Sequence, residues 1–103
     1  MAVQMNVSFS QGKACIALSG RFDFSAYREF REAYTRGMEK EGITELELDM
    51  NAVEYMDSSA LGMLLLLKER TDAASMKLGL THCHGTVEQI LQIANFNKII
   101  SVN

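Results

Sequence analysis

Residues 44–70 have the sequence TELELDMNAVEYMDSSALGMLLLLKER, in which the spacing of apolar residues changes half-way. Over 45–50 apolar and acidic side chains alternate, which is the period of a strand with one face on a core. From Ser58 onward leucines recur at helical spacing, and no proline or β-branched residue interrupts them before Arg70. The stretch therefore predicts a strand over 45–50, a connection over 51–56 and then a helix.

The three residues at the expected start of this helix, Asp57, Ser58 and Ser59, all have side chains that suit a helix N-terminus. Each can accept a hydrogen bond from an unpaired backbone N–H of the first turn, and an acid there suits the helix dipole. A phosphate on a serine at this place would also be accommodated by backbone N–H groups. The residues are thus either caps alone or the site of a phosphoserine switch.

The helix after Ser58 is apolar nearly all round, so it must be covered on two sides. One stripe consists of Leu61, Leu64 and Leu65, and the remaining apolar residues are Ala60, Met63, Leu66 and Leu67. A chain of 103 residues has limited material for such cover. We therefore expect another protein to cover part of the helix, with Met63, Leu66 and Leu67 offering apolar contacts.

Residues 55–62, YMDSSALG, resemble the Asp-Ser-Ser/Thr-Gly-Leu-Gly motif of the STAS domain, a family typified by bacterial anti-sigma factor antagonists. The resemblance extends over the whole chain. Residues 18–23, LSGRFD, are similar to the family's Leu-x-Gly-x-Leu-Asp segment, Leu48-Asp49 to its third strand, and 95–100, NFNKII, to its C-terminal ending. The one departure within the motif is Ala60, where glycine is commonest.

The resemblance implies that Ser58, the first serine after the aspartate, is the phosphoacceptor. The unmodified form would bind an anti-sigma factor, often itself a serine kinase, and so free the sigma factor; a PP2C-type phosphatase would remove the phosphate. Asp57 would start the helix and contact the kinase, and Asp23 would be a loop acid near the site or only a cap. The implied partner-binding residues are Asp23, Asp57, Ser59, Ala60, Leu61, Gly62, Met63 and Leu66.

An adaptor role is the alternative. STAS-like subunits of lipid ABC transporters share the Asp-Ser-x-Gly-Leu core without a known need for phosphorylation, and function depends on the site rather than on the fold. The paired serines after Asp57 and the full-length resemblance favour the anti-sigma factor antagonist.

The remaining chain predicts an α/β fold with the order β-β-α-β-α-β-α and a possible last strand, in a single STAS domain over 1–103. We expect a mixed sheet of four to five strands with three to four helices. The expected strands are 3–9, 13–19 and 76–81 besides the central one, and the expected helices are 22–41, 58–70 and 87–94. Gly20 is expected to break the second strand, residues 68–75 to form a polar link, and 99–102 to be extended.

Local details add to this prediction. Asp23 or Ser25 can cap the first helix, which Gly42 ends, and on its charged face Arg28/Glu32 and Glu32/Arg36 are spaced for ion pairs. Thr86 can cap the last helix, and Asn95 can close it. Parallel strands joined by crossovers place binding sites at their carboxyl ends. Ser58 should therefore lie near the loop over 20–24 and the loop over 82–85.

Bulk properties exclude several functions. The net charge of −3 offers no basic face for nucleic acid. No apolar run approaches the roughly 20 residues of a membrane span, and the first six residues lack the pattern of a signal peptide. We therefore expect a cytoplasmic protein that acts on neither membrane nor nucleic acid.

No enzyme, cofactor or metal motif stands out. The pattern Gly-x-Ser-x-Gly is absent and the glycines are scattered, so we expect no catalytic residues and no cofactor. His82 and His84, the only histidines, could reach Ser58 as bases, but a strand end leading into a loop explains them. With Cys83 they supply three potential zinc ligands where a structural site needs four, so no metal is expected. Cys15 and Cys83 are interpreted as buried reduced thiols.

Overall fold

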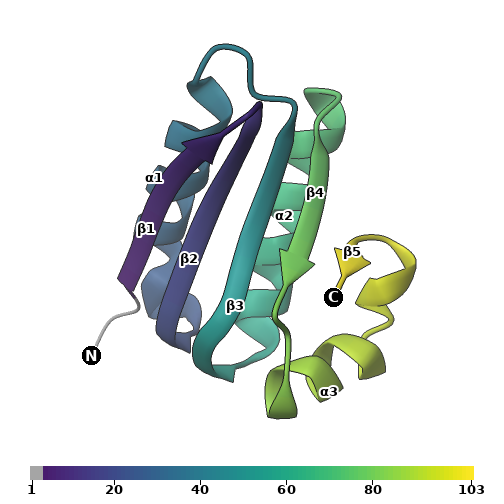
Figure 1. Ribbon diagram of the computed structural model, residues 1–103. Helices are drawn as coiled ribbons and strands as arrows, with labels where there is room; N and C mark the ends of the chain where they lie inside the picture. Colours follow the sequence, from purple (N-terminus) through teal and green to yellow (C-terminus); the bar gives the residue numbers. More distant parts are fainter. Residues whose placement is uncertain (1–3) are drawn as a thin grey trace.

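The computed structural model describes residues 4–103, and it has the α/β architecture that the sequence predicts (Figure 1). The strands are β1 (Gln4–Ser10), β2 (Lys13–Phe22), β3 (Glu45–Met56), β4 (Lys77–Thr81) and β5 (Ser101–Val102). The α-helices are α1 (Tyr27–Glu39), α2 (Ser58–Ala73) and α3 (Gly85–Ile93), with 3-10 turns at Phe24–Ala26 and Phe96–Lys98. The predicted element order and mixed sheet are confirmed. Val3, the first residue of the expected first strand, lies outside the described residues.

The five strands form one sheet in the order β1-β2-β3-β4-β5. The β1–β2 pair is an antiparallel hairpin, and its turn at Gln11 and Gly12 uses positive φ angles of 49° and 80°. The pairs β2–β3, β3–β4 and β4–β5 are parallel. The carboxyl ends of β2, β3 and β4 therefore meet at one edge of the sheet, where ligand sites of such folds lie.

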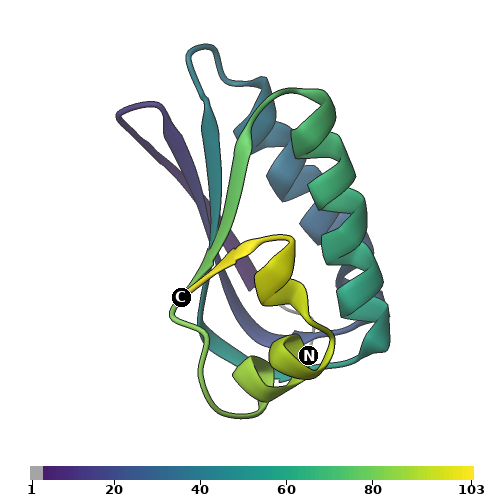
Figure 2. The same cartoon turned by 90° about the vertical axis from the view of Figure 1, so that its right-hand side faces the viewer.

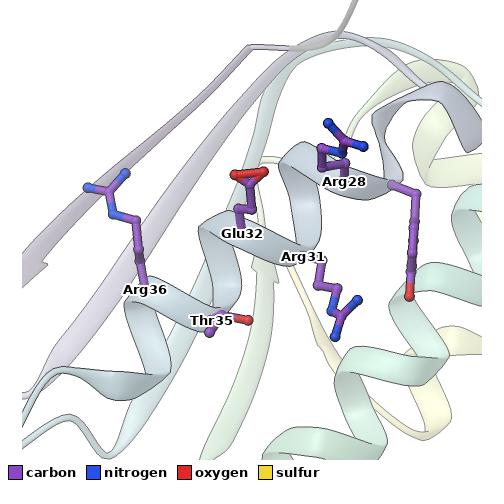
Figure 3. A pocket seen from close by; sticks show the side chains of 6 residues that line it. Arg28, Arg31, Glu32, Thr35 and Arg36 are labelled. Atoms are coloured by element: carbon purple, nitrogen blue, oxygen red, sulfur yellow. The ribbon is translucent and has the colours of Figure 1, made fainter.

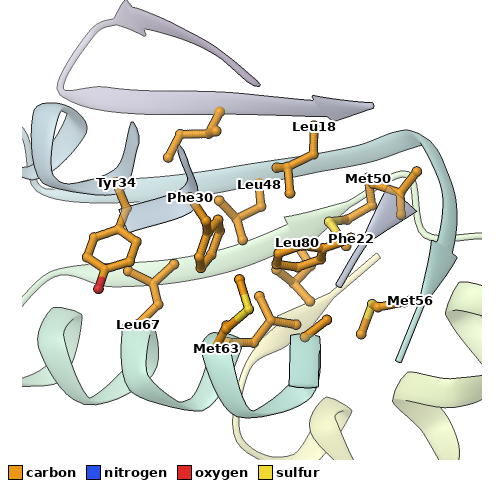
Figure 4. Close-up of a cluster of buried hydrophobic side chains, with 14 of the residues drawn as sticks. Leu18, Phe22, Phe30, Tyr34, Leu48, Met50, Met56, Met63, Leu67 and Leu80 are labelled. Atoms are coloured by element: carbon orange, nitrogen blue, oxygen red, sulfur yellow. The ribbon is translucent and has the colours of Figure 1, made fainter. Parts of the chain in front are cut away.

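Helices α1 and α2 cover the same face of the sheet (Figure 2). Leu46, Leu48 and Met50, the apolar half of the alternating pattern, are fully buried beneath them, and Figure 4 shows the cluster in which they take part. At Gly37 of α1 an added Cβ would lie 3.1 Å from a methyl carbon of Leu46. The absence of a side chain there lets α1 approach the sheet closely.

Two strands are longer than predicted. The expected connection over 51–56 is the second half of β3, in which the buried residues Val53 and Met56 are three positions apart. The spacing differs from two because the pairing with β2 shifts register, and Gly20, with φ +93°, lies at that shift. Gly20 thus bends β2 without ending it, contrary to the prediction.

The helix ends also differ from prediction. Helix α2 continues to Ala73, so most of the expected polar link is helical. The N-cap of α3 is His84, whose side chain makes no capping bond, and Thr86 is not the cap. Asn95 closes α3 in the left-handed conformation at φ 60°, as predicted. Within residues 4–103, every helix is too short or too polar to cross a bilayer.

Candidate functional site

The register between β2 and β3 places two acidic residues at the same edge of the sheet. Phe22 pairs with Met56 as the last pair of the two strands, so Asp23 and Asp57 follow at equivalent positions. Both side chains start a helical turn. Asp23 accepts a hydrogen bond from the backbone N–H of Ser25, and Asp57 accepts one from Ala60, each at 3.0 Å. The capping predicted for Asp57 is confirmed. Asp23 caps the 3-10 turn that precedes α1, whereas the N-cap of α1 itself is Ala26, which makes no side-chain capping bond.

Asp23 has further partners that keep it ionised. The Ser25 hydroxyl donates to Oδ1 at 2.5 Å, and Nε of Arg21 lies 3.6 Å from Oδ2. The hydrogen bonds from Ser25, with the charge of Arg21 in support, hold the pKa of Asp23 below its usual value. Asp23 is therefore ionised, with Arg21 as its counter-ion, one strand away from Asp57.

An arginine and two exposed aromatic residues accompany these acids. Arg21 pairs with Tyr55 across the strands, and its guanidinium carbon lies 3.9 Å from the centre of the Tyr55 ring. Phe24, which follows Asp23, is 70% exposed and stacks on Tyr27 with ring centres 6.2 Å apart. The sequence predicted that the loop over 20–24 lies near Ser58 but did not single out Arg21, Tyr55 or Phe24, because the contact of Arg21 with Tyr55 depends on the strand register.

Ser58 is the first residue of α2 and is exposed. No hydrogen bond joins its side chain to another residue within 4–103. Along the helix from Ser58, the exposed residues Gly62, Leu65 and Leu66 follow at helical spacing. Leu65 and Leu66 are 42% and 47% exposed. We call Ser58, Gly62, Leu65 and Leu66 the α2 face.

The expected partner-binding set is only partly available on this surface. Ala60 and Met63 are 0% and 4% exposed and pack into the core, so the expectation that their side chains contact a partner is corrected. Leu67, expected to offer an apolar contact, is fully buried for the same reason. Ser59 and Leu61 are half-buried beside the α2 face. Leu65 was predicted to share one apolar stripe with Leu64, but Leu64 is buried and Leu65 points outward. Because four leucines follow one another, the sequence pattern does not show which of them face the core and which face outward.

The two histidines interact with β3 well before its carboxyl end. Nδ1 of His82 lies 3.0 Å from Oδ1 of Asp49, and Nε2 of His84 lies 2.7 Å from the carbonyl oxygen of Asn51. In the part of the chain that the structure describes, neither contacts Ser58 by a hydrogen bond, and no three metal-binding side chains gather.

Both cysteines are free thiols, as interpreted from the sequence. Cys83 is buried, and burial, with the charge of Glu88 in support, raises its pKa to about 11. Cys15 is only half-buried on the open face of the sheet, so its expected full burial is corrected. Burial followed by the charges of Glu47 and Asp49 raises the pKa of Cys15 as well.

Comparison with known proteins agrees with the fold. A STAS-domain containing protein of Pseudomonas aeruginosa (strain UCBPP-PA14) is 36% identical over 105 residues, which cover the whole of both chains. A putative anti-sigma factor antagonist of Thermotoga maritima has a similar structure, with a TM-score of 0.84 at 15% identity over 95% of this chain and 84% of that one.

Two further proteins of known structure share this fold. The anti-sigma factor antagonist SpoIIAA of Bacillus, solved in unphosphorylated and phosphorylated forms, matches in its unphosphorylated form with a TM-score of 0.72 at 17% identity over 97% of this chain and 87% of that one. A sulfate transporter family protein of Wolinella succinogenes matches with a TM-score of 0.78 at 16% identity, over 92% and 79% of the two chains. The STAS domain family model itself matches residues 4–103, and the chain belongs to this family.

Proposed function

We propose that this protein is a cytoplasmic anti-sigma factor antagonist whose unmodified form binds an anti-sigma factor, and that phosphorylation of Ser58 ends the complex. The observation that carries the proposal is the position of Ser58. Ser58 is exposed at the start of α2, at the head of a surface to which Leu65 and Leu66 contribute exposed apolar side chains. A kinase can reach such a hydroxyl without unfolding the helix.

The charges around Ser58 give the modification its effect. A phosphate adds about two negative charges at neutral pH, directly after Asp57 and at the same sheet edge as Asp23. Backbone N–H groups of the first helical turn can solvate it, so the helix itself is retained. A partner covering Leu65 and Leu66 would have to bury this charge, and the cost of its desolvation would oppose binding.

Other residues take supporting roles in the proposal. Asp57 fixes the helix start that presents Ser58 and contacts the kinase, while Asp23, ionised and paired with Arg21, is a loop acid at the same sheet edge. Ser59 and Leu61 flank the α2 face and contribute contacts at its margin. The partners are an anti-sigma factor, a serine kinase that is either that same protein or a separate one, and a PP2C-type phosphatase. The existence of both phosphorylated and unphosphorylated SpoIIAA structures supports this assignment.

The test is the intact mass of the protein purified from its own cells under phosphatase inhibition, beside Ser58→Ala and Ser59→Ala variants. We expect one phosphate adduct in the wild type and in Ser59→Ala, none in Ser58→Ala, and an anti-sigma factor bound to the unmodified protein. Loss of the adduct in Ser59→Ala instead would reassign the phosphoacceptor. No adduct under any growth condition, with ABC-transporter subunits recovered as the partners, would overturn the proposal in favour of an adaptor.

A further inference from the structure

The outer surface of the two long helices carries a trough whose arginines have no part in the proposed switch. It consists of two hollows that share Tyr27 and Arg31. The first, shown in Figure 3, lies along α1 and is lined by Tyr27, Arg28, Arg31, Glu32, Thr35 and Arg36. The second lies between α1 and α2 and is lined by Tyr27, Arg31, Tyr34, Leu66, Glu69 and Arg70. We call the two together the arginine trough.

The trough concentrates positive charge in a chain whose net charge is −3. It is lined by the arginines Arg28, Arg31, Arg36 and Arg70, against the acids Glu32 and Glu69. Among residues 4–103 none of these arginines has a carboxylate oxygen within 4.0 Å, so the expected pairs of Glu32 with Arg28 and Arg36 are not formed. Figure 3 shows Glu32 between these two arginines without meeting either. Their guanidinium groups remain available to an external acid.

The trough is continuous with the α2 face. Leu66 belongs to both surfaces, and Arg70, one helical turn further along α2, lies with its guanidinium carbon 5.8 Å from the centre of the Tyr34 ring. A partner that covers Leu66 therefore reaches the arginines of the trough in the same contact. Arginine and tyrosine are, with tryptophan, the residue types enriched among those that dominate binding at protein interfaces.

The shape of the trough favours a macromolecular ligand. All four arginines are exposed, and Tyr27 and Thr35 are only half-buried. A small anion would be held by a concave site that encloses most of its surface, and this trough encloses little. An extended or helical protein segment fits an open groove, because its contacts are spread along its length.

We propose that the arginine trough binds an acidic segment of the partner protein that docks on the α2 face. The inference rests on the proposed function for the place of the partner, and it adds the chemistry of that partner: carboxylate side chains facing Arg31 and Arg70, with apolar residues over Leu66. Bidentate arginine–carboxylate pairs give such a contact its direction. The inference also deepens the switch, since a phosphate on Ser58 repels an acidic partner more strongly than a neutral one.

The test uses two synthetic amphipathic 18-residue peptides with the same leucines, one with glutamates and one with lysines on its polar side. Each is titrated into the unmodified, isotope-labelled protein while backbone amide NMR signals are followed. We expect the glutamate peptide to shift signals of α1 and α2 around Arg31 and Leu66. Its affinity should fall about tenfold or more in an Arg31→Glu/Arg70→Glu variant. A Lys77→Glu/Lys98→Glu variant, which reverses two exposed charges outside the trough, is the matched control.

Three outcomes would overturn the inference: equal binding of the lysine peptide, shifts outside the trough, or an equal loss in the control variant. Binding of pyrophosphate in the trough without binding of the glutamate peptide would assign the arginines to a small anion instead. Failure of the proposed function would be detected by a different experiment. Its test is the phosphate on Ser58 in cells, whereas the peptide titration uses protein without phosphate and can also be run on Ser58→Ala.

Discussion

The carboxylate of Asp57 lies 3.0 Å from the backbone nitrogen of Ala60, which makes it the cap of the helix that presents Ser58. Removing this acceptor in Asp57→Ala should lower the free energy of unfolding by about 1 kcal/mol. Asp57→Asn, which keeps a capping oxygen, should lose only a few tenths. Urea denaturation followed by circular dichroism measures both. Equal losses in the two variants would show that the charge, and not the cap, stabilises the helix start.

The same pair of variants separates capping from recognition by the kinase. If Asp57 contacts the kinase through its charge, Asp57→Asn should remain folded but be phosphorylated more slowly on Ser58. The measurement is the rate of phosphate incorporation by the kinase that the cell experiment identifies. An unchanged rate in Asp57→Asn would limit Asp57 to its structural role.

Gly62 occupies an exposed position inside α2 at which neither backbone conformation nor packing requires a glycine. A Cβ added at this position would have no atom within 4 Å. Gly62→Ala should therefore raise the free energy of unfolding by about 0.5–1 kcal/mol, because alanine favours the helix. The same methyl group would stand on the α2 face and hinder a closely packed partner. We expect a variant that is more stable and binds its partner less tightly, measured by urea denaturation and by titration calorimetry.

Gly37 is the control for Gly62, because it is also a helical glycine but faces the core. A Cβ there would lie 3.1 Å from Leu46 and 3.2 Å from Ala14, both in the core. The gain in helix propensity in Gly37→Ala is opposed by crowding of α1 against the sheet. Gly37→Ala should thus gain less stability than Gly62→Ala and leave partner binding unchanged. A larger gain at Gly37 would contradict this account of how α1 packs.

Of the four consecutive leucines of α2, two should matter for the stability of the fold and the other two for binding of the partner. Leu64 and Leu67 are fully buried, and their replacement by alanine should cost about 2–5 kcal/mol of stability. Leu65 and Leu66 are 42% and 47% exposed, so alanine there should change stability by less than about 0.5 kcal/mol while weakening partner binding. Unchanged binding in Leu65→Ala and Leu66→Ala would remove the α2 face from the interface.

These leucines also show what the sequence could predict and what it could not. The alternation over 45–50 and the helical spacing after Ser58 were sufficient to predict the central strand and helix, because burial on one face leaves a clear period. A run of four leucines does not show which side of the helix faces the core. The outward direction of Leu65 and Leu66 is therefore set by how α2 lies on the sheet, which the sequence pattern does not show. The motif likewise placed Ser58 at the helix start, and the expected topology named two neighbouring loops, but neither showed which side chains share its surface.

The second half of β3 and the end of β2 could not be predicted for a related reason. Their pairing includes a register shift at Gly20, and buried residues Val53 and Met56 are spaced by three, so the period of two disappears. The contact between Arg21 and Tyr55 is a product of that register. Side chains that meet across parallel strands are far apart in sequence, and no local pattern connects them.

The thiol of Cys83 should react slowly with disulfide reagents in the folded protein. Burial raises its pKa from 9.0 to about 11, so its thiolate is about a hundredfold scarcer near neutral pH than in the unfolded chain. The greater nucleophilicity of a more basic thiolate recovers part of this factor, which leaves reaction with an aromatic disulfide reagent about tenfold slower or more. In a Cys15→Ser background, the rate at Cys83 should keep rising as the pH is raised beyond 9. A rate that levels off near pH 9 would show that Cys83 is as solvated in the fold as in the unfolded chain.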